Sequence, residues 1–118
     1  MQLRMLRAKL HQARVTETHL HYHGSITIDR ELLSRSGLLA GECVDVANLS
    51  SGSRFTTYII AGESGSGVIG INGAAARLCE VGDRVIVLGY ALMEESEARD
   101  FRPKVLILDE QNQVTEEI

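Results

Sequence analysis

The sequence predicts a mainly β fold with short helices, closed into a small barrel. Short segments in which apolar and polar side chains alternate recur along the chain of 118 residues, as expected for half-buried strands. Only two stretches suit helices, and both are short, which favours a barrel over a sheet with helical crossovers. The length fits a single domain spanning residues 1–118, and no internal repeat or linker interrupts it.

The first predicted strand covers residues 6–11, where apolar and polar side chains alternate strictly. This alternation places Lys9 and His11 on the same face of the strand. The apolar residues Ala13 and Val15 are out of phase with the preceding pattern. We therefore expect a bulge or a strong twist after the first half of this strand.

Residues 19–23 alternate in the same way and carry three histidines in an H-x-H-x-H pattern. A strand here would place these imidazoles on one face, where two of them could ligate zinc. No carboxylate or cysteine completes a ligand set nearby, so we favour an exposed strand edge and predict no metal site. Gly24 then interrupts the pattern, and a β-prone segment resumes at residues 25–28.

The two predicted helices are identified by their ends. Asp29 can cap a helix over residues 30–36, and Gly37 can end it. Asn72 is predicted to cap a second, alanine-rich helix that runs to residue 78. Further strands are predicted at residues 44–49, 54–61, 68–71, 84–92 and 104–108, and the last, polar residues are expected to be frayed.

Charge and cysteine content narrow the classes of function. The net charge of −4 argues against a nucleic-acid-binding protein, and no apolar run is long enough for a membrane helix. No signal peptide is recognisable, and the two cysteines, Cys43 and Cys79, are not in a C-x-x-C pair. We therefore expect reduced thiols and a cytoplasmic location. The basic residues before Glu17 could face an anionic substrate or simply solvent.

Three motifs are ambiguous when each is taken alone. Residues 65–70 match G-x-G-x-x-G, but a strand begins inside the motif, so we reject a dinucleotide site. Residues 72–76 form a turn into a helix N-terminus, which suits an anion but equally an ordinary helix start. On the strand at 54–58, Arg54 and Tyr58 share a face that could bind a carboxylate or be an ordinary mixed face.

The dipeptide Gly24-Ser25 has a specific chemical capacity. A serine hydroxyl can attack the carbonyl group of the preceding residue if the backbone is held in a bent geometry. Gly24 favours this attack because it has no Cβ and tolerates unusual backbone angles.

Taken together, five segments resemble the aspartate 1-decarboxylase family, and they occur in the family's order and spacing. These segments are Lys9-Leu10-His11, Leu20-His21-Tyr22-x-Gly24-Ser25, Thr27-Ile28-Asp29, Arg54-Phe55-Thr56-Thr57-Tyr58 and Asn72-Gly73-Ala74-Ala75-Ala76. The resemblance implies a double-psi β-barrel and a homotetramer with active sites between subunits. It also implies decarboxylation of L-aspartate to β-alanine and carbon dioxide for pantothenate biosynthesis, with a pyruvoyl group as cofactor and neither a metal nor pyridoxal phosphate.

The resemblance also assigns residues. A precursor would cleave itself between Gly24 and Ser25 into residues 1–24 and 25–118, with the pyruvoyl group formed from Ser25 and with Thr57 assisting. Tyr58 is our choice as the donor that protonates the decarboxylated intermediate. The substrate pocket would be lined by Lys9, Arg54, Asn72, Gly73, Ala74 and Ala75, with His11 and Tyr22 close by. The residues His23, Ala47 and Arg77 depart from the family's usual pattern, and a separate maturation protein is compatible with the sequence.

Two other hypotheses remain open on sequence alone. One is a zinc-binding module built on the three histidines. The other is a non-enzymatic domain that binds a protein or a nucleic acid through Arg4, Arg7 and Arg14. Both predict an intact chain, whereas the decarboxylase hypothesis predicts two fragments.

Overall fold

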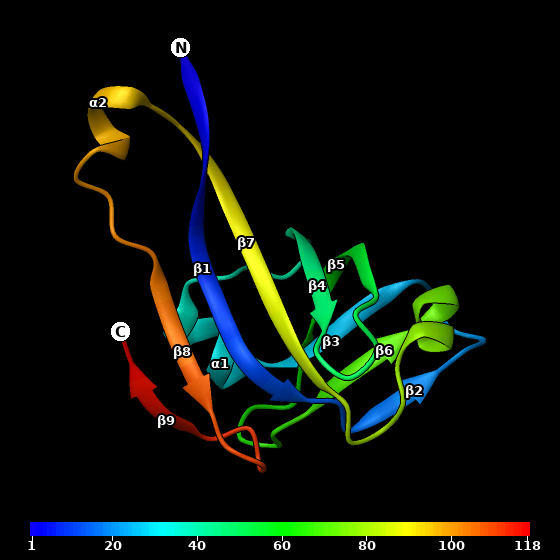
Figure 1. Ribbon diagram of the computed structural model, residues 1–118. Coiled ribbons are helices and arrows are strands. Elements are labelled where there is room, and N and C mark those ends of the chain that lie inside the picture. Colours follow the sequence, from blue (N-terminus) through cyan, green and yellow to red (C-terminus); the bar gives the residue numbers. More distant parts are fainter.

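In the computed structural model, which describes residues 1–118, nine strands form one curved sheet in the order β2-β6-β3-β5-β4-β7-β1-β8-β9 (Figure 1). The strands are β1 (Gln2–Arg14), β2 (Glu17–His19), β3 (Ser25–Asp29), β4 (Cys43–Asn48), β5 (Arg54–Gly62), β6 (Ile69–Asn72), β7 (Arg84–Glu94), β8 (Lys104–Leu108) and β9 (Val114–Glu117). The helices are α1 (Arg30–Ser36), the 3₁₀ helix η1 (Gly73–Leu78) and α2 (Glu95–Ala98). The predicted class, mainly β with short helices, is confirmed.

The two longest strands, β1 and β7, pair antiparallel and lie side by side, and β7 leads directly into α2 (Figure 1). Their register shifts between Leu6 and Ala8 and again between Leu10 and Ala13. At the second shift Gln12 has a φ of 63°, which lies in the left-handed region. The predicted bulge is therefore confirmed, and it returns alternate apolar residues to the inner face.

The chain segment after β1 joins the two ends of the curved sheet. Thr16 N–H donates to the carbonyl oxygen of Ile69 at 2.8 Å, and Thr16 Oγ1 accepts from the N–H of Ile69 at 3.0 Å. Since β6 continues through β3, β5, β4 and β7 back to β1, these bonds curl the sheet onto itself. The arrangement agrees with the small barrel predicted from the sequence.

The interior holds one hydrophobic cluster of 19 buried residues. On β4, for example, Val44 and Val46 face this cluster whereas Asp45 between them faces outward. A fully buried aliphatic side chain of this kind stabilises the folded state by about 1.5–3 kcal/mol. Alternation along the strands therefore decides which side chains remain on the outer face for chemistry. No helix of the structure is long and apolar enough to span a membrane.

Helix α1 begins and ends as predicted. The carboxylate of Asp29 accepts the N–H of Glu31 at 2.9 Å, and Gly37 adopts a φ of 83° and donates to the carbonyl oxygen of Leu33. The second helix also lies where expected, but it is a 3₁₀ helix, and Asn72 at its start makes no capping hydrogen bond. The predicted cap is wrong because the Asn72 amide is engaged elsewhere, as described below.

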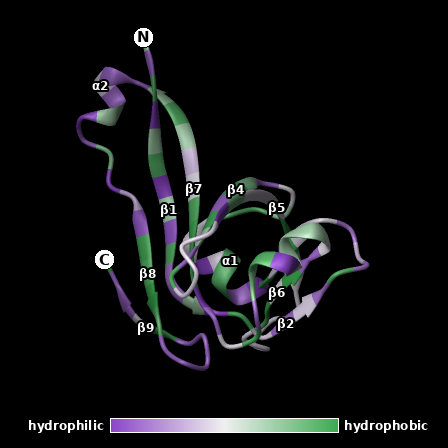
Figure 2. Cartoon of the chain, turned by 45° about the vertical axis from the view of Figure 1, so that its right-hand side comes forward, coloured by the Kyte–Doolittle hydropathy of each residue, from purple (hydrophilic) through white to green (hydrophobic).

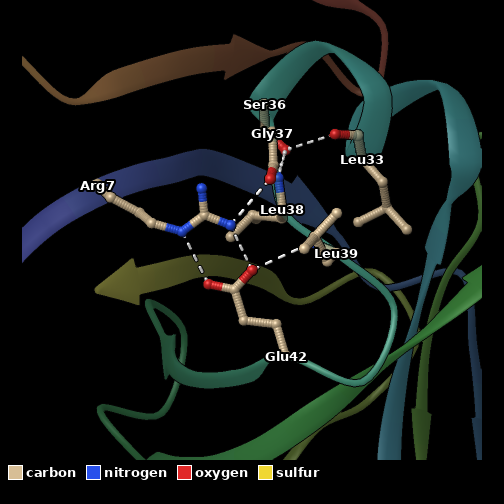
Figure 3. A network of polar contacts seen from close by, with 7 residues as sticks. All are labelled: Arg7, Leu33, Ser36, Gly37, Leu38, Leu39 and Glu42. Carbon is tan, nitrogen blue, oxygen red and sulfur yellow. Dashed lines mark hydrogen bonds and ion pairs between the residues drawn. The ribbon is translucent and has the colours of Figure 1, made fainter. Parts of the chain in front are cut away.

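A four-residue network fixes the segment after α1 against β1 (Figure 3). Arg7 Nε donates to Glu42 Oε2 at 3.0 Å, and its Nη2 donates to the carbonyl oxygen of Gly37 at 2.8 Å. Glu42 Oε1 also accepts the N–H of Leu39 at 3.1 Å. The helix end and the following loop are thereby held to the strand that carries Lys9.

The glycine-rich segment at residues 65–70 has a structural role. The N–H groups of Gly65 and Gly67 donate to the two carboxylate oxygens of Asp29 at 2.9 and 2.8 Å. At Gly67, whose φ is +71°, a Cβ would lie 2.9 Å from the carbonyl oxygen of Gln111, so only glycine fits. An internal carboxylate thus occupies these donors, which supports the rejection of a dinucleotide site.

Two expectations about exposed segments are wrong. Strand β2 ends at His19 and a turn follows, closed by Tyr22 N–H and the carbonyl oxygen of His19, so His19, His21 and His23 do not share a strand face. The polar C-terminus is not frayed, because β9 pairs antiparallel with β8. Figure 2 shows β9 in mostly hydrophilic colours beside a largely hydrophobic β8. Backbone pairing holds the strand there, together with Val114, which packs against the hydrophobic cluster.

Candidate active site

Sheet register places Ser25 between two other predicted site residues. Ser25 is the direct partner of Asn72 in the antiparallel pair β3/β6. On its other side, Ile26 is level with Ile59 in the parallel pair β3/β5, so Ser25 is level with Tyr58 one residue earlier. Adjacent strands lie about 4.8 Å apart. Three residues that are far apart in sequence therefore form one row across the sheet.

The hydroxyl group of Ser25 is buried and fixed. Ser25 is 0% exposed. Its Oγ donates to the carbonyl oxygen of His23 at 2.9 Å and accepts from Asn72 Nδ2 at 2.9 Å. The same amide nitrogen donates to Thr27 Oγ1 at 3.0 Å. Sequence reasoning named Thr27 only within a segment that resembles the family and gave it no role in the site, although its position two residues after Ser25 puts both side chains on one strand face.

Gly73 packs directly against the peptide that precedes Ser25. Gly73 has a φ of +76°, and a Cβ there would lie 2.6 Å from the Cα of Gly24 and 3.1 Å from the carbonyl oxygen of Tyr22. At Gly24, by contrast, a Cβ would meet nothing within 4 Å. The backbone around the expected cleavage point is therefore confined by Gly73, and the absence of a side chain matters most at that residue.

The alternation predicted for β5 is confirmed. Arg54, Thr56 and Tyr58 are exposed, whereas Phe55 and Thr57 between them are half-buried. Tyr58 is 41% exposed, which leaves its phenol accessible beside the Ser25 row. Thr57 points to the other side of the strand, at the level of the residue before Ser25.

An open groove of about 680 Å³ adjoins this row. The residues that line it are Glu17, His19, Leu20, His21, Tyr22, Thr27, Ile60 and Asn72. Asn72 thus connects the groove with the buried Ser25 hydroxyl. Of the small residues after Gly73, Ala74 is exposed and Ala75 packs against the hydrophobic cluster.

The predicted carboxylate-binding residues lie elsewhere on the chain. Arg54 is four residues from Tyr58 on β5, which corresponds to about 13 Å along an extended strand. Lys9 lies on β1, four strand-to-strand steps from β3 in the sheet order, or about 19 Å along the sheet. The structure therefore places Gly24, Ser25, Asn72 and Gly73 in contact and Tyr58 level with them, whereas the polar contacts of Arg54 are with Asp45 and Tyr90.

His11 accompanies Lys9 on β1. Its Nδ1 is buried and has no hydrogen-bond partner in the chain. Burial lowers the pKa of His11, and the neighbouring charge of Lys9 lowers it further. His11 is therefore favoured in its neutral form, with one ring nitrogen free.

The surroundings of Ser25 fit a small carbonyl group formed at that position. The Asn72 amide already donates a hydrogen bond to the oxygen on residue 25 and could donate equally to a ketone oxygen. The Ser25 side chain is buried, and the His23 carbonyl and Asn72 amide that bond it are neutral. No cluster of three or more histidine, cysteine, aspartate or glutamate side chains in the chain is placed to hold a metal ion.

Comparisons with known proteins identify the family of the chain. A family model described as aspartate decarboxylase matches residues 1–115. The aspartate 1-decarboxylase of Carboxydothermus hydrogenoformans is 55% identical over 95% of this chain and 88% of its own length. The proteins of the same name from Thermoanaerobacter pseudethanolicus and Maricaulis maris are 52% and 55% identical, over 95% and 97% of this chain and 96% and 94% of their own. The chain therefore belongs to the aspartate decarboxylase family and is a decarboxylase, a class of lyase.

Proposed function

We propose that the chain is a self-processing precursor that cleaves between Gly24 and Ser25 into residues 1–24 and 25–118. The larger fragment would carry a pyruvoyl group at position 25 and decarboxylate L-aspartate to β-alanine and carbon dioxide. The observation that carries the proposal is the buried Ser25 hydroxyl, held between the His23 carbonyl and the Asn72 amide. Family membership supports the substrate class.

Maturation begins with attack of Ser25 Oγ on the carbonyl carbon of Gly24. The bond from that carbon to the nitrogen of Ser25 breaks, so the peptide becomes an ester. Loss of the α-proton of Ser25 then expels the Gly24 carboxylate and leaves a double bond, and hydrolysis releases ammonia and leaves a ketone. The Thr57 hydroxyl, or a backbone N–H, stabilises the oxyanion of the first step. Packing of Gly73 against Gly24 holds the scissile peptide in place.

In the mature enzyme a pyruvoyl ketone held at residue 25 would supply the electron sink for decarboxylation. Asn72 donates to the oxygen on residue 25 and fixes its orientation. Tyr58, level with that residue and accessible, donates the proton to the carbon that loses carbon dioxide. Arg54 and Lys9 bind the two substrate carboxylates, and the Gly73, Ala74 and Ala75 backbone lines the pocket with His11 and Tyr22 close by.

The separation between the two groups of residues supports an oligomeric enzyme. Within one chain Lys9 lies four strands from β3 in the sheet order, and Arg54 contacts Asp45 and Tyr90 and not the row of Ser25 and Tyr58. We assign them to the active site of a neighbouring copy, in a homotetramer with sites between subunits. The enzyme acts in the cytoplasm and supplies pantothenate biosynthesis, with or without a maturation protein.

The experiment is a denaturing gel with intact-mass measurement, combined with an assay of β-alanine formation. We expect two fragments split after Gly24, of which only the fragment 25–118 reacts with a carbonyl reagent. An intact chain that produces β-alanine, or cleavage at another bond, would contradict the proposal.

A further inference from the structure

The outer face of the sheet beside Arg54 carries a fixed carboxylate that nothing above assigns to the site. Asp45 on β4 is the direct partner of Thr56 on β5. Thr56 Oγ1 donates to Asp45 Oδ1 at 2.7 Å, and Asp45 Oδ2 lies 3.5 Å from Arg54 Nη2. The Asp45 side chain is only 16% exposed, against 55% for Arg54. The mostly buried Asp45 carboxylate, fixed by Thr56, therefore contacts the long and more exposed side chain of Arg54.

Tyr90 on β7 completes this arrangement. Its hydroxyl oxygen accepts a hydrogen bond from Arg54 Nη2 at 3.1 Å. The guanidinium of Arg4 lies 3.8 Å from the centre of the Tyr90 ring, and Arg4 Nη2 lies 4.0 Å from Asp45 Oδ2. The hydrogen bond from Thr56 lowers the pKa of Asp45 against the opposing effect of burial, and Tyr90, Arg54 and Arg4 lower it further. Asp45 is therefore charged at neutral pH.

The contacts of Arg54 with Asp45 and Tyr90 use only one of its nitrogens. Both Tyr90 and Asp45 contact Nη2, and neither Nη1 nor Nε of Arg54 has a hydrogen-bond partner within the chain. A guanidinium held at one corner cannot rotate freely, and its remaining N–H groups are available to a carboxylate. Exposed ion pairs add little to stability, so the orientation of Arg54 is the main consequence of this arrangement.

We propose that Asp45 and Tyr90 are positioning residues that hold the Arg54 guanidinium in the orientation that receives a substrate carboxylate. This inference rests on the role of Arg54 in the proposed function. Neither residue touches the substrate. They reduce the conformational freedom that Arg54 would otherwise lose when the substrate binds.

The test compares Asp45→Asn and Tyr90→Phe with the wild type, using fully cleaved enzyme and L-aspartate. Each variant should raise KM by about three- to tenfold, the usual effect of one charge-assisted hydrogen bond. The value of kcat should stay within about twofold, and cleavage after Gly24 should be unchanged, because neither step needs Arg54 to be oriented. Glu42→Gln removes a carboxylate from the Arg7 pair instead and should leave KM unchanged.

Arg54→Lys separates this inference from the proposed function. If Arg54→Lys leaves KM unchanged, the role of Arg54 itself is wrong. If Arg54→Lys raises KM but Asp45→Asn and Tyr90→Phe leave it unchanged or lower it, only the positioning role is wrong. In an enzyme that already carries Arg54→Lys, Asp45→Asn should raise KM by a smaller factor than it does in the wild type. An equal factor in both backgrounds would also overturn the inference. If Asp45→Asn does not fold, the KM of Tyr90→Phe decides whether the positioning role holds, because this variant keeps the ring beneath Arg4.

Discussion

The Ser25 region and the Arg54 region differ in how complete each is within one chain. Ser25 and Asn72 are buried, and their hydrogen bonds are satisfied by groups of the same chain. Arg54 is more than half exposed and keeps free donors toward solvent. Cleavage is a reaction of the chain with itself, so a preorganised buried site suits it. Binding of an external acid needs an accessible and incomplete site.

The same strand, β5, serves both regions. Tyr58 in the middle of β5 is level with Ser25, whereas Arg54 at the start of the strand contacts residues of β4 and β7. The rigid spacing of an extended strand keeps the two functions apart in one copy. In the proposed tetramer, the carboxylate-binding residues of one subunit would face residue 25 of another subunit. The cleavage steps should then be separable from the substrate-binding steps by mutation.

The largest effect is expected for Ser25→Ala. This variant lacks the buried hydroxyl that attacks the Gly24 carbonyl in the proposed cleavage, so we expect a single uncut chain without decarboxylase activity. A gel and a β-alanine assay measure both outcomes. Ser34→Ala removes an exposed hydroxyl elsewhere and should behave as the wild type. Clean cleavage of Ser25→Ala between residues 24 and 25 would show that the Ser25 hydroxyl is not needed for cleavage, and it would contradict self-processing by the buried Ser25 region.

Tyr58→Phe and Thr57→Val separate the two reactions on adjacent residues. Tyr58→Phe keeps the ring and removes only the phenolic O–H. Tyr58→Phe should therefore cleave normally but turn over aspartate about 10²–10⁴-fold more slowly, as expected for loss of a general acid. Thr57→Val should leave mostly uncut precursor. Normal turnover by cleaved Tyr58→Phe would assign the proton to another donor.

Gly73→Ala tests the confinement of the scissile peptide. The added Cβ would contact Gly24 at 2.6 Å in a positive-φ conformation, so we expect a loss of about 1–3 kcal/mol in the free energy of unfolding, together with slow cleavage. Gly24→Ala is the matched control, since its Cβ meets nothing within 4 Å. Denaturant unfolding measures both. Equal destabilisation by the two variants would mean that Gly73 does not confine the peptide.

Local patterns in the sequence predicted the local features of the fold. The alternation at residues 54–58, the bulge in β1 and both ends of α1 depend on neighbouring residues and were correct. The hydrogen bond of the Asn72 amide could not be predicted from local patterns, because its partner Ser25 is 47 residues away. The C-terminal strand was missed for a similar reason. Its preceding turn is anchored by buried Asn112, which bonds Arg14 across 98 residues.

The smallest effect is expected where β1, the strand that carries Lys9, is fixed to the segment after α1. Burial would raise the pKa of Glu42, but the hydrogen bonds from Arg7 and Leu39 and the charge of Arg7 together lower it. A carboxylate whose folded pKa lies below its unfolded value stabilises the protein above about pH 4.3, and this contribution is lost as the pH falls through the folded pKa. Glu42→Gln should therefore cost about 1 kcal/mol of unfolding free energy at pH 7.

The difference between Glu42→Gln and the wild type should shrink below about pH 4. Other carboxylates with lowered pKa values, Asp45 and Asp83, titrate in both proteins and cancel in this comparison. Glu95→Gln, which removes an exposed pair with Arg99, should cost less than about 0.5 kcal/mol. Cleavage should be complete in Glu42→Gln, because the buried Ser25 region does not depend on this attachment. A difference that persists unchanged at low pH would mean that Glu42 acts through packing and not through its charge.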